Sequence, residues 1–182
     1  MAEPKIPFDV KLFIAITYAD DQLYEQVNGI LQSSFGPVDC LSAIFPFDYT
    51  QYYTEEMGQG LVKRLLSFER LIPPDGLPDI KLQTNHIEDQ FAVNGKRRVN
   101  LDPGYLSAAN VVMATAKNFD HRIYLGKGIF GDVQLRYRGN KFHFSPWTYP
   151  DYKDKYIIDF LARSRKIYMK EFDKMMRAKG QK

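Results

Sequence analysis

The chain of 182 residues has one cysteine, one tryptophan and no long apolar run. The single cysteine, Cys40, excludes an intramolecular disulfide and a metal site built from several cysteines. No apolar stretch approaches the ~18 residues needed to cross a bilayer, and the N-terminal segment lacks the basic, apolar and small-residue pattern of a signal peptide. We therefore expect a cytoplasmic protein without a membrane partner.

Several common nucleotide-binding and catalytic motifs are also missing. Gly126-Lys127-Gly128 lacks both the upstream glycine and the hydroxyl of a phosphate-binding P-loop. The first expected strand enters its helix through Tyr18-Ala19-Asp20, without the glycines of a dinucleotide fingerprint. No serine lies in a Gly-x-Ser-x-Gly context. The sequence therefore identifies no cofactor.

Charge is distributed unevenly along the chain. Residues 1–93 hold 6 Lys/Arg against 14 Asp/Glu, a net −8, and residues 94–182 hold 19 against 8, a net +11. This split favours an anionic small molecule or a nucleic acid as partner of the second half, or a homo-oligomer held by charge complementarity. A solvated basic helix at the C-terminus would explain much of the same excess.

Hydrophobic periodicity predicts an α+β fold. Strands are expected at Lys11–Ala19, Val38–Phe47, Leu61–Leu71 and Lys96–Leu101, and helices at Asp21–Phe35 and 78–93. Asp20 is the expected N-cap of the first helix, and Asp48–Gly60 is expected to be a loop. The segment Leu61–Leu71 suits a strand or a helix, and the adjacent Pro73-Pro74 favours a strand. The order matches the split βαβ arrangement of a ferredoxin-like antiparallel sheet backed by helices.

Residues 105–182 are expected to form an extension packed on the ferredoxin-like unit of residues 1–104, in a single domain. The extension would contain a helix, a β-hairpin and a long helix. The expected elements are a helix at Ala108–Ala116 capped by Ser107, a strand at His121–Leu125, a hairpin of Asp132–Tyr137 with Lys141–Phe144 around Gly139-Asn140, and an amphipathic helix at Lys155–Ala178.

The stretch from Gly95 to Tyr152 concentrates charged and tyrosine side chains beside glycine and proline turns. Strand alternation places Arg98, Asn100 and Asp102 on one face, with Arg97 on the other. Arg122 and Tyr124 share a face of the next strand, and Lys127 lies in a glycine turn. Convergence of these groups would form an anion pocket, whereas surface ion pairs with the acidic first half are the alternative. The candidate ligand-binding residues are Lys96, Arg98, Asn100, Tyr105, Arg122, Tyr124 and Lys127.

Three residues are candidates for proton transfer. His121 opens an expected strand, and the histidine side chain is the type best suited to proton transfer near neutral pH, although a capping or core-edge role fits it too. Asp48 and Asp102 each end an expected strand. A carboxylate there could act as a base, or it could bind a divalent cation together with a phosphorylated ligand. Asp102 also fits a turn role before Pro103-Gly104. No dedicated metal-ligand set is present.

Several strings resemble the bacterial domain-of-unknown-function family 4416. They are FGPVD at 35–39, PFDYTQYYTEEMG at 46–58, LLSFERLI at 65–72, RRVNLDPGYL at 97–106, HRIYLGKGIF at 121–130 and PWTYPDY at 146–152. The resemblance spans nearly the whole chain and implies a compact single domain. It implies no activity, ligand or catalytic residue.

Three functions are compatible with these patterns. The first is a binder of a phosphorylated or anionic ligand, such as a nucleotide or short RNA, through a basic pocket. The second is an enzyme that acts on a phosphorylated or acidic small molecule, for which a pocket should join Asp48, Asp102 and His121. The third is a structural or interaction module assembled by the charge split, which predicts salt-sensitive association.

Overall fold

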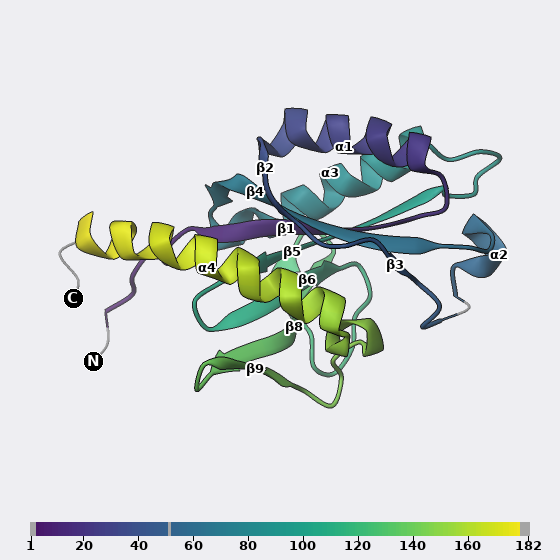
Figure 1. Ribbon diagram of the computed structural model, residues 1–182. Coiled ribbons are helices and arrows are strands. Elements are labelled where there is room, and N and C mark those ends of the chain that lie inside the picture. Colours follow the sequence, from purple (N-terminus) through teal and green to yellow (C-terminus); the bar gives the residue numbers. More distant parts are fainter. Residues whose placement is uncertain (1–2, 51, 179–182) are drawn as a thin grey trace.

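The computed structural model describes residues 3–50 and 52–178. These residues form a nine-stranded antiparallel sheet with helices on both faces (Figure 1). The strands are β1 Val10–Tyr18, β2 Val38–Leu41, β3 Phe45–Pro46, β4 Val62–Ile72, β5 Val99–Leu106, β6 Asn110–Thr115, β7 Ile123–Gly126, β8 Ile129–Arg138 and β9 Lys141–Phe144. The helices are α1 Asp21–Phe35, α2 Thr54–Met57, α3 Leu77–Gln90 and α4 Lys155–Ala178, with 3-10 turns η1 Pro74–Gly76 and η2 Pro150–Lys153.

The strand order is β2-β4-β1-β5-β6-β8-β7, with β3 paired to β4 and β9 to β8. Strand β4 lies between β1 and β2, so the unit of β1, α1 and β2 is split, as the element order predicts. This confirms the α+β class with an antiparallel sheet and a long C-terminal helix. Strand β5 continues past residue 104 to Leu106, and β6 pairs with it in the same sheet.

Helix α1 has the predicted bounds, and its termini explain them. The Asp20 side chain accepts hydrogen bonds from the backbone N–H groups of Gln22 (2.9 Å) and Leu23 (3.2 Å). Gly36 ends the helix at φ 98°, a conformation that favours glycine, and its N–H donates to the carbonyl of Gln32. Helix α4 also has its predicted bounds.

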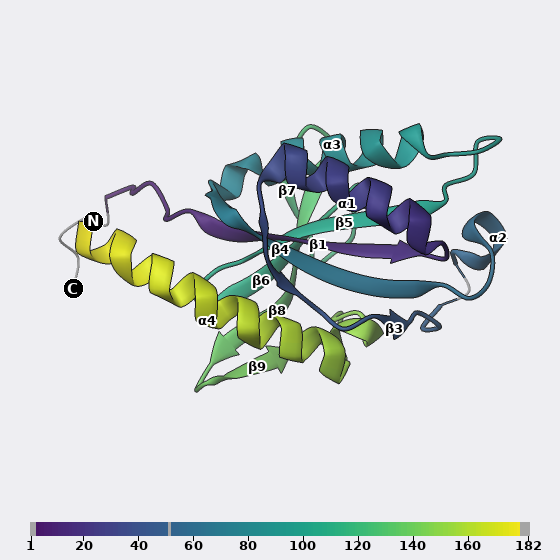
Figure 2. The same ribbon diagram turned by 45° about the horizontal axis from the view of Figure 1, so that its top comes forward.

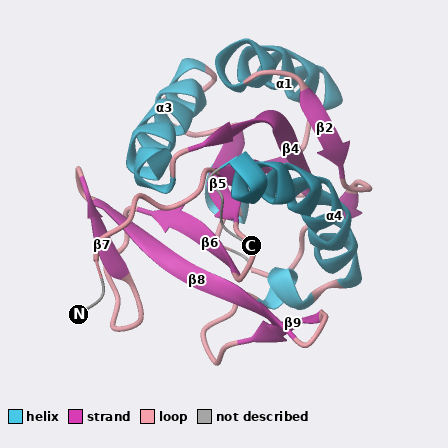
Figure 3. Ribbon diagram, turned by 90° about the vertical axis from the view of Figure 1, so that its left-hand side faces the viewer, coloured by secondary structure: helices cyan, strands magenta, loops and turns pink. Residues whose placement is uncertain are grey.

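The two faces of the sheet are covered by different helices. In β1, Leu12, Ile14 and Ile16 pack beneath α1 and α3, whereas Phe13 and Ala15 face the core beneath α4. Figure 2 shows α1 and α3 together over one face, and Figure 3 shows α4 between the central strands and the β8–β9 hairpin. The apolar stripe of α4 therefore docks on the core. No helix within residues 3–50 and 52–178 is long and apolar enough to cross a membrane.

The expected helix at Ala108–Ala116 is wrong, because Asn110–Thr115 forms strand β6. Alternate residues of β6 enter two different cores, so both of its faces are buried and its apolar run shows no alternation. The Ser107 hydroxyl accepts hydrogen bonds from the N–H groups of Ala109 and Asn110, but these bonds close a turn rather than cap a helix.

Further boundaries differ from expectation. The single strand expected at Val38–Phe47 is broken into β2 and β3, and the expected loop after it contains the short helix α2. Strand β5 begins at Val99 and passes through Pro103 to Leu106, so Asp102 lies within the strand rather than at its end. Strand β6 pairs with β5 only from Gly104 onward, so Pro103 lies outside the stretch that this neighbour covers.

The interior of β5 yields a stability prediction. A Cβ added at Gly104 would lie 2.6 Å from Met113 Sδ, 2.7 Å from the Val112 carbonyl oxygen and 2.8 Å from the Phe13 ring. The backbone oxygen cannot move without distorting the β5–β6 pairing. We expect Gly104→Ala to lower the free energy of unfolding by about 3 kcal/mol in urea denaturation.

The control is Gly29→Ala in helix α1. No atom lies within 4 Å of a Cβ added there, and alanine favours helix over glycine. This variant should be more stable than wild type by roughly 0.5–1 kcal/mol. Equal stability of the two variants would contradict the packing of β5 against β6.

Candidate functional site

A cavity of about 750 Å³ lies at the end of the sheet where β4 and β5 begin, β6 ends and α3 finishes. Phe47, Tyr49, Thr50, Tyr52 and Tyr53, which lie between β3 and α2, and residues 149–152 around η2 complete its walls. Figure 1 shows α2 at this end of the sheet. Its lining includes Phe47, Tyr49, Tyr52, Tyr53, Lys63, Lys81, Asn85, Glu88, Asp89, Arg97, Asn100, Asp102, Met113, Thr115, Lys117, Tyr149, Asp151 and Tyr152.

Two lining residues of the cavity, Lys63 and Asn100, belong to a row of polar residues across three adjacent strands. Thr17 of β1 is in register with Lys63 of β4 on one side and with Asn100 of β5 on the other. All three are buried. The Thr17 hydroxyl has no hydrogen-bond partner within the described residues. The Lys63 Nζ lies 2.6 Å from Asp151 Oδ2, an ion pair that ties the segment before α4 to the sheet.

A second buried lysine belongs to the same cavity. Lys81 of α3 donates from Nζ to the carbonyl of Leu101 at 2.8 Å and lies 3.5 Å from Asp102 Oδ1. The other oxygen of Asp102 accepts a hydrogen bond from Asn100 Nδ2 at 2.7 Å. The Asp102 side chain stays 31% exposed, so its carboxylate is held from two sides and still open to the cavity.

Glu88, near the end of α3, is the lining carboxylate whose pKa departs most from its ordinary value. Its Oε1 accepts the backbone N–H of Leu101 at 2.6 Å, and its Oε2 lies 3.5 Å from Arg97 Nη1. Burial raises the pKa of Glu88 to about 7, although the nearby Lys81 cation opposes the shift. Glu88 can therefore gain or lose a proton near neutral pH.

Arg97 joins the cavity wall to helix α2. Its guanidinium donates to both oxygens of Glu56, from Nε at 2.8 Å and from Nη2 at 2.7 Å, and also to Asn100 Oδ1 at 2.9 Å. The hydrogen bonds from Arg97 lower the pKa of Glu56. Arg97 precedes the first residue of β5, so strand alternation does not govern its side. The expectation that Arg97 lies on the other face of the strand from Asn100 is therefore wrong, because the two side chains are hydrogen-bonded.

Aromatic rings form much of the remaining wall, and three of them lie against cations. Lys63 Nζ is 3.9 Å from the centre of the Phe47 ring, Lys117 Nζ is 4.2 Å from that of Tyr52, and Arg97 Cζ is 5.8 Å from that of Tyr53. Burial raises the pKa of Tyr149 to about 12 and also raises the pKa of Tyr152 well above its ordinary value. These phenols remain neutral at physiological pH.

The lining contains as many cations as carboxylates. The cations are Lys63, Lys81, Arg97 and Lys117, and the carboxylates are Glu88, Asp89, Asp102 and Asp151. Of the four cations, only Lys117 forms no ion pair with a described residue. No cluster of three or more His, Cys, Asp or Glu side chains within residues 3–50 and 52–178 is arranged to hold a metal. The cavity is thus polar and ring-lined, with balanced formal charge.

Of the residues proposed from the sequence, Asn100 and Asp102 line this cavity. Arg98 instead forms an exposed ion pair with Asp20 at 3.0 Å, and Lys127 pairs with Asp79. The expected convergence of the Arg98 strand face with the Lys127 turn does not occur. For these two cations, the alternative of surface pairs with the acidic first half is what the structure contains.

His121 and Arg122 belong to a second polar cluster, centred on the fully buried Asp132. Arg122 Nε lies 2.9 Å and His121 Nε2 lies 3.3 Å from Asp132 Oδ2, and Gln134 donates to the other oxygen at 2.7 Å. Arg122 Nη2 also donates to the hydroxyl of Tyr149 at 2.8 Å. The cluster fastens the start of β7 to β8, and neither His121 nor Arg122 lines the cavity.

The other candidates lie elsewhere. Asp48 is exposed and is not a lining residue, although both of its chain neighbours are. Lys96 is exposed in the turn before β5, Tyr105 is half-buried beneath α3, and the Tyr124 hydroxyl accepts a hydrogen bond from the Gly128 N–H at 3.3 Å. Asp48, Asp102 and His121 were expected to share one pocket. Of these three residues, only Asp102 lines the cavity.

Sequence reasoning missed most of the lining. Lys63 and Lys81 lie at positions that alternation or helical spacing places inside, since Lys63 alternates with Leu65 and Lys81 follows Leu77 by one helical turn. A lysine at an inward position is seldom tolerated without a partner, and this was the available signal. Glu88, Arg97 and Asp151 gave no comparable signal, because their partners are distant in the sequence.

The environment of Glu88 predicts a pH-dependent stability difference. Its raised pKa means that the folded protein binds this proton more tightly than the unfolded chain does. Stability from this group is therefore present at low pH and is lost as the pH rises from about 4.5 towards 7. Glu88→Gln removes the titration and keeps an acceptor for the Leu101 N–H. We expect its stability relative to wild type to increase by about 2 kcal/mol between pH 5 and pH 8 in urea unfolding.

The control is Glu55→Gln, which changes an exposed glutamate of α2. Its stability relative to wild type should stay constant within about 0.5 kcal/mol over the same range. Parallel stability curves for wild type and Glu88→Gln would show that Glu88 does not titrate near neutral pH in the folded state.

Comparison with known proteins identifies a family but no named relative. The family model described as "Domain of unknown function (DUF4416)" matches residues 8–168. Searches of curated proteins and of solved structures gave no match. Because the matched region covers most of the chain, the protein belongs to the DUF4416 family.

Proposed function

We propose that this protein binds a small organic molecule that carries a ring and one anionic group, such as a nucleoside monophosphate, in the cavity at the end of the sheet. The observation that carries the proposal is the convergence, on a cavity of about 750 Å³, of buried polar groups and aromatic rings from distant segments. Ligand sites characteristically combine a ring-lined hollow with a few fixed polar groups.

The tyrosine-rich wall supports a ring in the ligand. Tyr52 is 57% exposed, and the neutral phenols of Tyr53 and Tyr149 also line the cavity. An aromatic ring stacks well on such surfaces, and phenol hydroxyls supply hydrogen bonds at its edge. Asn85 and Asn100 add amide groups that both donate and accept.

Two lysines support the anionic group. Lys117 forms no ion pair with a described residue, and Lys81 lies 3.5 Å from Asp102, so both amines have donors left for a ligand oxygen. Lys63 and Arg97 are engaged by carboxylates at 2.6 and 2.7 Å. The balanced lining charge favours one anionic group over a polyphosphate or a long nucleic acid, because Asp89, Asp102 and Asp151 would repel additional negative charge.

The binding proposal predicts a selective effect of Lys117→Gln. A thermal-shift panel of nucleoside mono- and triphosphates, sugar phosphates and dicarboxylates should identify stabilising compounds, with the monophosphates ahead of the triphosphates. In calorimetric titration of the best compound, Lys117→Gln should raise Kd about tenfold, because a hydrogen bond to a charged group contributes roughly 1.5 kcal/mol. Lys117 is exposed, so the fold should be unaffected.

Lys127→Gln provides the matched control, since it removes an exposed lysine outside the cavity. Its Kd should equal that of wild type. A panel without any stabilising compound would refute the proposal, and equal weakening by both variants would reduce it to a general charge effect.

A second candidate function is catalysis on the same ligand class, and the observation that favours it is the position of Glu88. A carboxyl group that titrates near pH 7 beside a cavity is suited to proton transfer. Asp102 and Lys81, which lie 3.5 Å apart in the lining, would orient the substrate. This assignment replaces His121, which contacts Asp132 outside the cavity lining.

Catalysis predicts that a compound found by the panel is consumed. Mass spectrometry of the mixture should show turnover by wild type and a rate at least 100-fold lower for Glu88→Gln. The variant should still bind the compound with a Kd close to that of wild type. Binding without turnover by the wild-type protein would leave the binding function and exclude catalysis on that compound.

A further inference from the structure

The positive charge of the second half is neutralised in one region and left unpaired in another. Arg97, Arg98 and Lys127 form ion pairs with Glu56, Asp20 and Asp79, all from the acidic first half. None of the cations of α4 and of the β8–β9 hairpin forms an ion pair with a described residue. These cations are Arg136, Arg138, Lys141, Lys155, Arg163, Arg165, Lys166, Lys170, Lys174 and Arg177.

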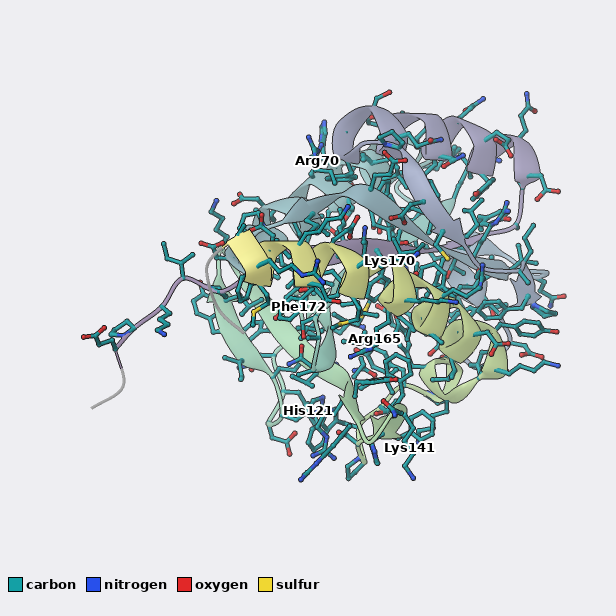
Figure 4. The ribbon with its side chains drawn as sticks, turned by 60° about the vertical axis from the view of Figure 1, so that its left-hand side comes forward. Arg70, His121, Lys141, Arg165, Lys170 and Phe172 are labelled. Atoms are coloured by element: carbon teal, nitrogen blue, oxygen red, sulfur yellow. The ribbon has the colours of Figure 1, made fainter. Side chains whose placement is uncertain are left out.

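Three of these cations border a groove between α4 and the hairpin. The groove has a volume of about 580 Å³ and contains Lys141, Arg165 and Lys166 beside aromatic rings. Phe144 is 46% exposed there and is open to stacking. The Arg165 guanidinium lies over the Tyr137 ring, 3.6 Å from the ring centre, and so stacks on it. Figure 4 shows Lys141 and Arg165 on this side of the molecule.

A second groove of about 490 Å³ lies along the other flank of α4, against the edge strand β2. Arg163, Lys166 and Lys170 line it. Lys166 borders both grooves, so the basic surface continues across the helix from β2 to the hairpin. We call this continuous region the α4 basic surface. Lys170 is visible on it in Figure 4.

We propose that the α4 basic surface binds single-stranded nucleic acid, with phosphates on the lysines and arginines and a base stacked on Phe144. A groove that combines unpaired cations with an exposed ring is the arrangement by which proteins hold single strands without reading sequence. A duplex offers phosphates but no free base for the ring. This surface is separate from the cavity, so the inference does not depend on the proposed small-molecule function.

The acidic residues of the surface do not cancel its charge. Helix α4 contains seven Lys/Arg and three Asp/Glu. One of the acids, Glu171, is paired with the buried Lys11 at 2.8 Å. Asp159 and Asp173 are exposed and remain available to neighbouring cations. The excess of unpaired cations supplies the attraction for a polyanion.

Fluorescence anisotropy with labelled 20-mers of oligouridine and oligothymidine tests this inference. Binding of either strand at 50 mM NaCl is expected, with affinity that falls steeply towards 200 mM. Each phosphate contact contributes a slope of about −0.7 to log K against log salt for single strands. The triple variant Lys141→Gln, Lys166→Gln, Lys170→Gln should bind at least tenfold more weakly, with a slope shallower by about 2.

Two matched controls isolate the surface from general charge. The triple variant Lys96→Gln, Arg98→Gln, Lys127→Gln removes the same number of exposed cations elsewhere, and its affinity should stay within twofold of wild type. Phe144→Ala should weaken binding roughly fivefold through lost stacking. Phe119→Ala, which removes an exposed ring outside both grooves, should not.

Four outcomes would overturn the inference. They are no binding of either strand at 50 mM NaCl, equal losses in the two triple variants, duplex bound as tightly as single strands, and an unchanged affinity in Phe144→Ala. Loss of small-molecule binding in Lys117→Gln with single-strand binding intact would support two separate sites. The two proposals can therefore fail independently.

Discussion

The structure depends on the neutralisation of three lysines that are removed from solvent. Lys11, Lys63 and Lys81 are at most 7% exposed, and each lies near a carboxylate from a distant segment. An unpaired charge in such a site would destabilise the fold by several kcal/mol, roughly 3–5. The pairs therefore fix which segments meet: β1 with β2 and α4, β4 with the segment before α4, and α3 with β5. The cavity lies where the last two of these pairs come together.

The same requirement explains how the charge asymmetry of the sequence is resolved. Acidic residues of the first half, such as Asp20, Glu56 and Asp79, are placed against cations of residues 97–127. The cations of α4 and the hairpin lie beyond the reach of these acids and remain unpaired with described residues. The net charge of +3 thus conceals a neutral cavity and a distinctly basic helix surface.

Caps and turns in the sequence predicted those elements whose bounds depend on residues close together in the chain. The Asp20 cap and the Gly36 terminus gave α1 its bounds, and the Gly139-Asn140 turn gave the hairpin. Strand β6 escaped prediction because both faces are buried, and its apolar run then has neither the period of a strand nor that of an amphipathic helix. The cavity escaped for a different reason. Its lining comes from six segments whose proximity is set by tertiary pairing, so only Asn100 and Asp102 were identified correctly as neighbours.

The two candidate sites differ in the physics that would hold their ligands. In the cavity, Lys81 and Asp102 are partly or fully removed from solvent, where salt screens charges weakly and hydrogen-bond geometry decides affinity. On the α4 basic surface, Lys166 and Lys170 are exposed, so attraction is long-ranged and is screened over about 10 Å at 0.1 M salt. The segment around Asp151 connects the two regions, since it is paired with Lys63 and is followed directly by α4. The proposed selectivity for a small molecule and the proposed affinity for a polyanion would therefore have separate structural origins within one fold.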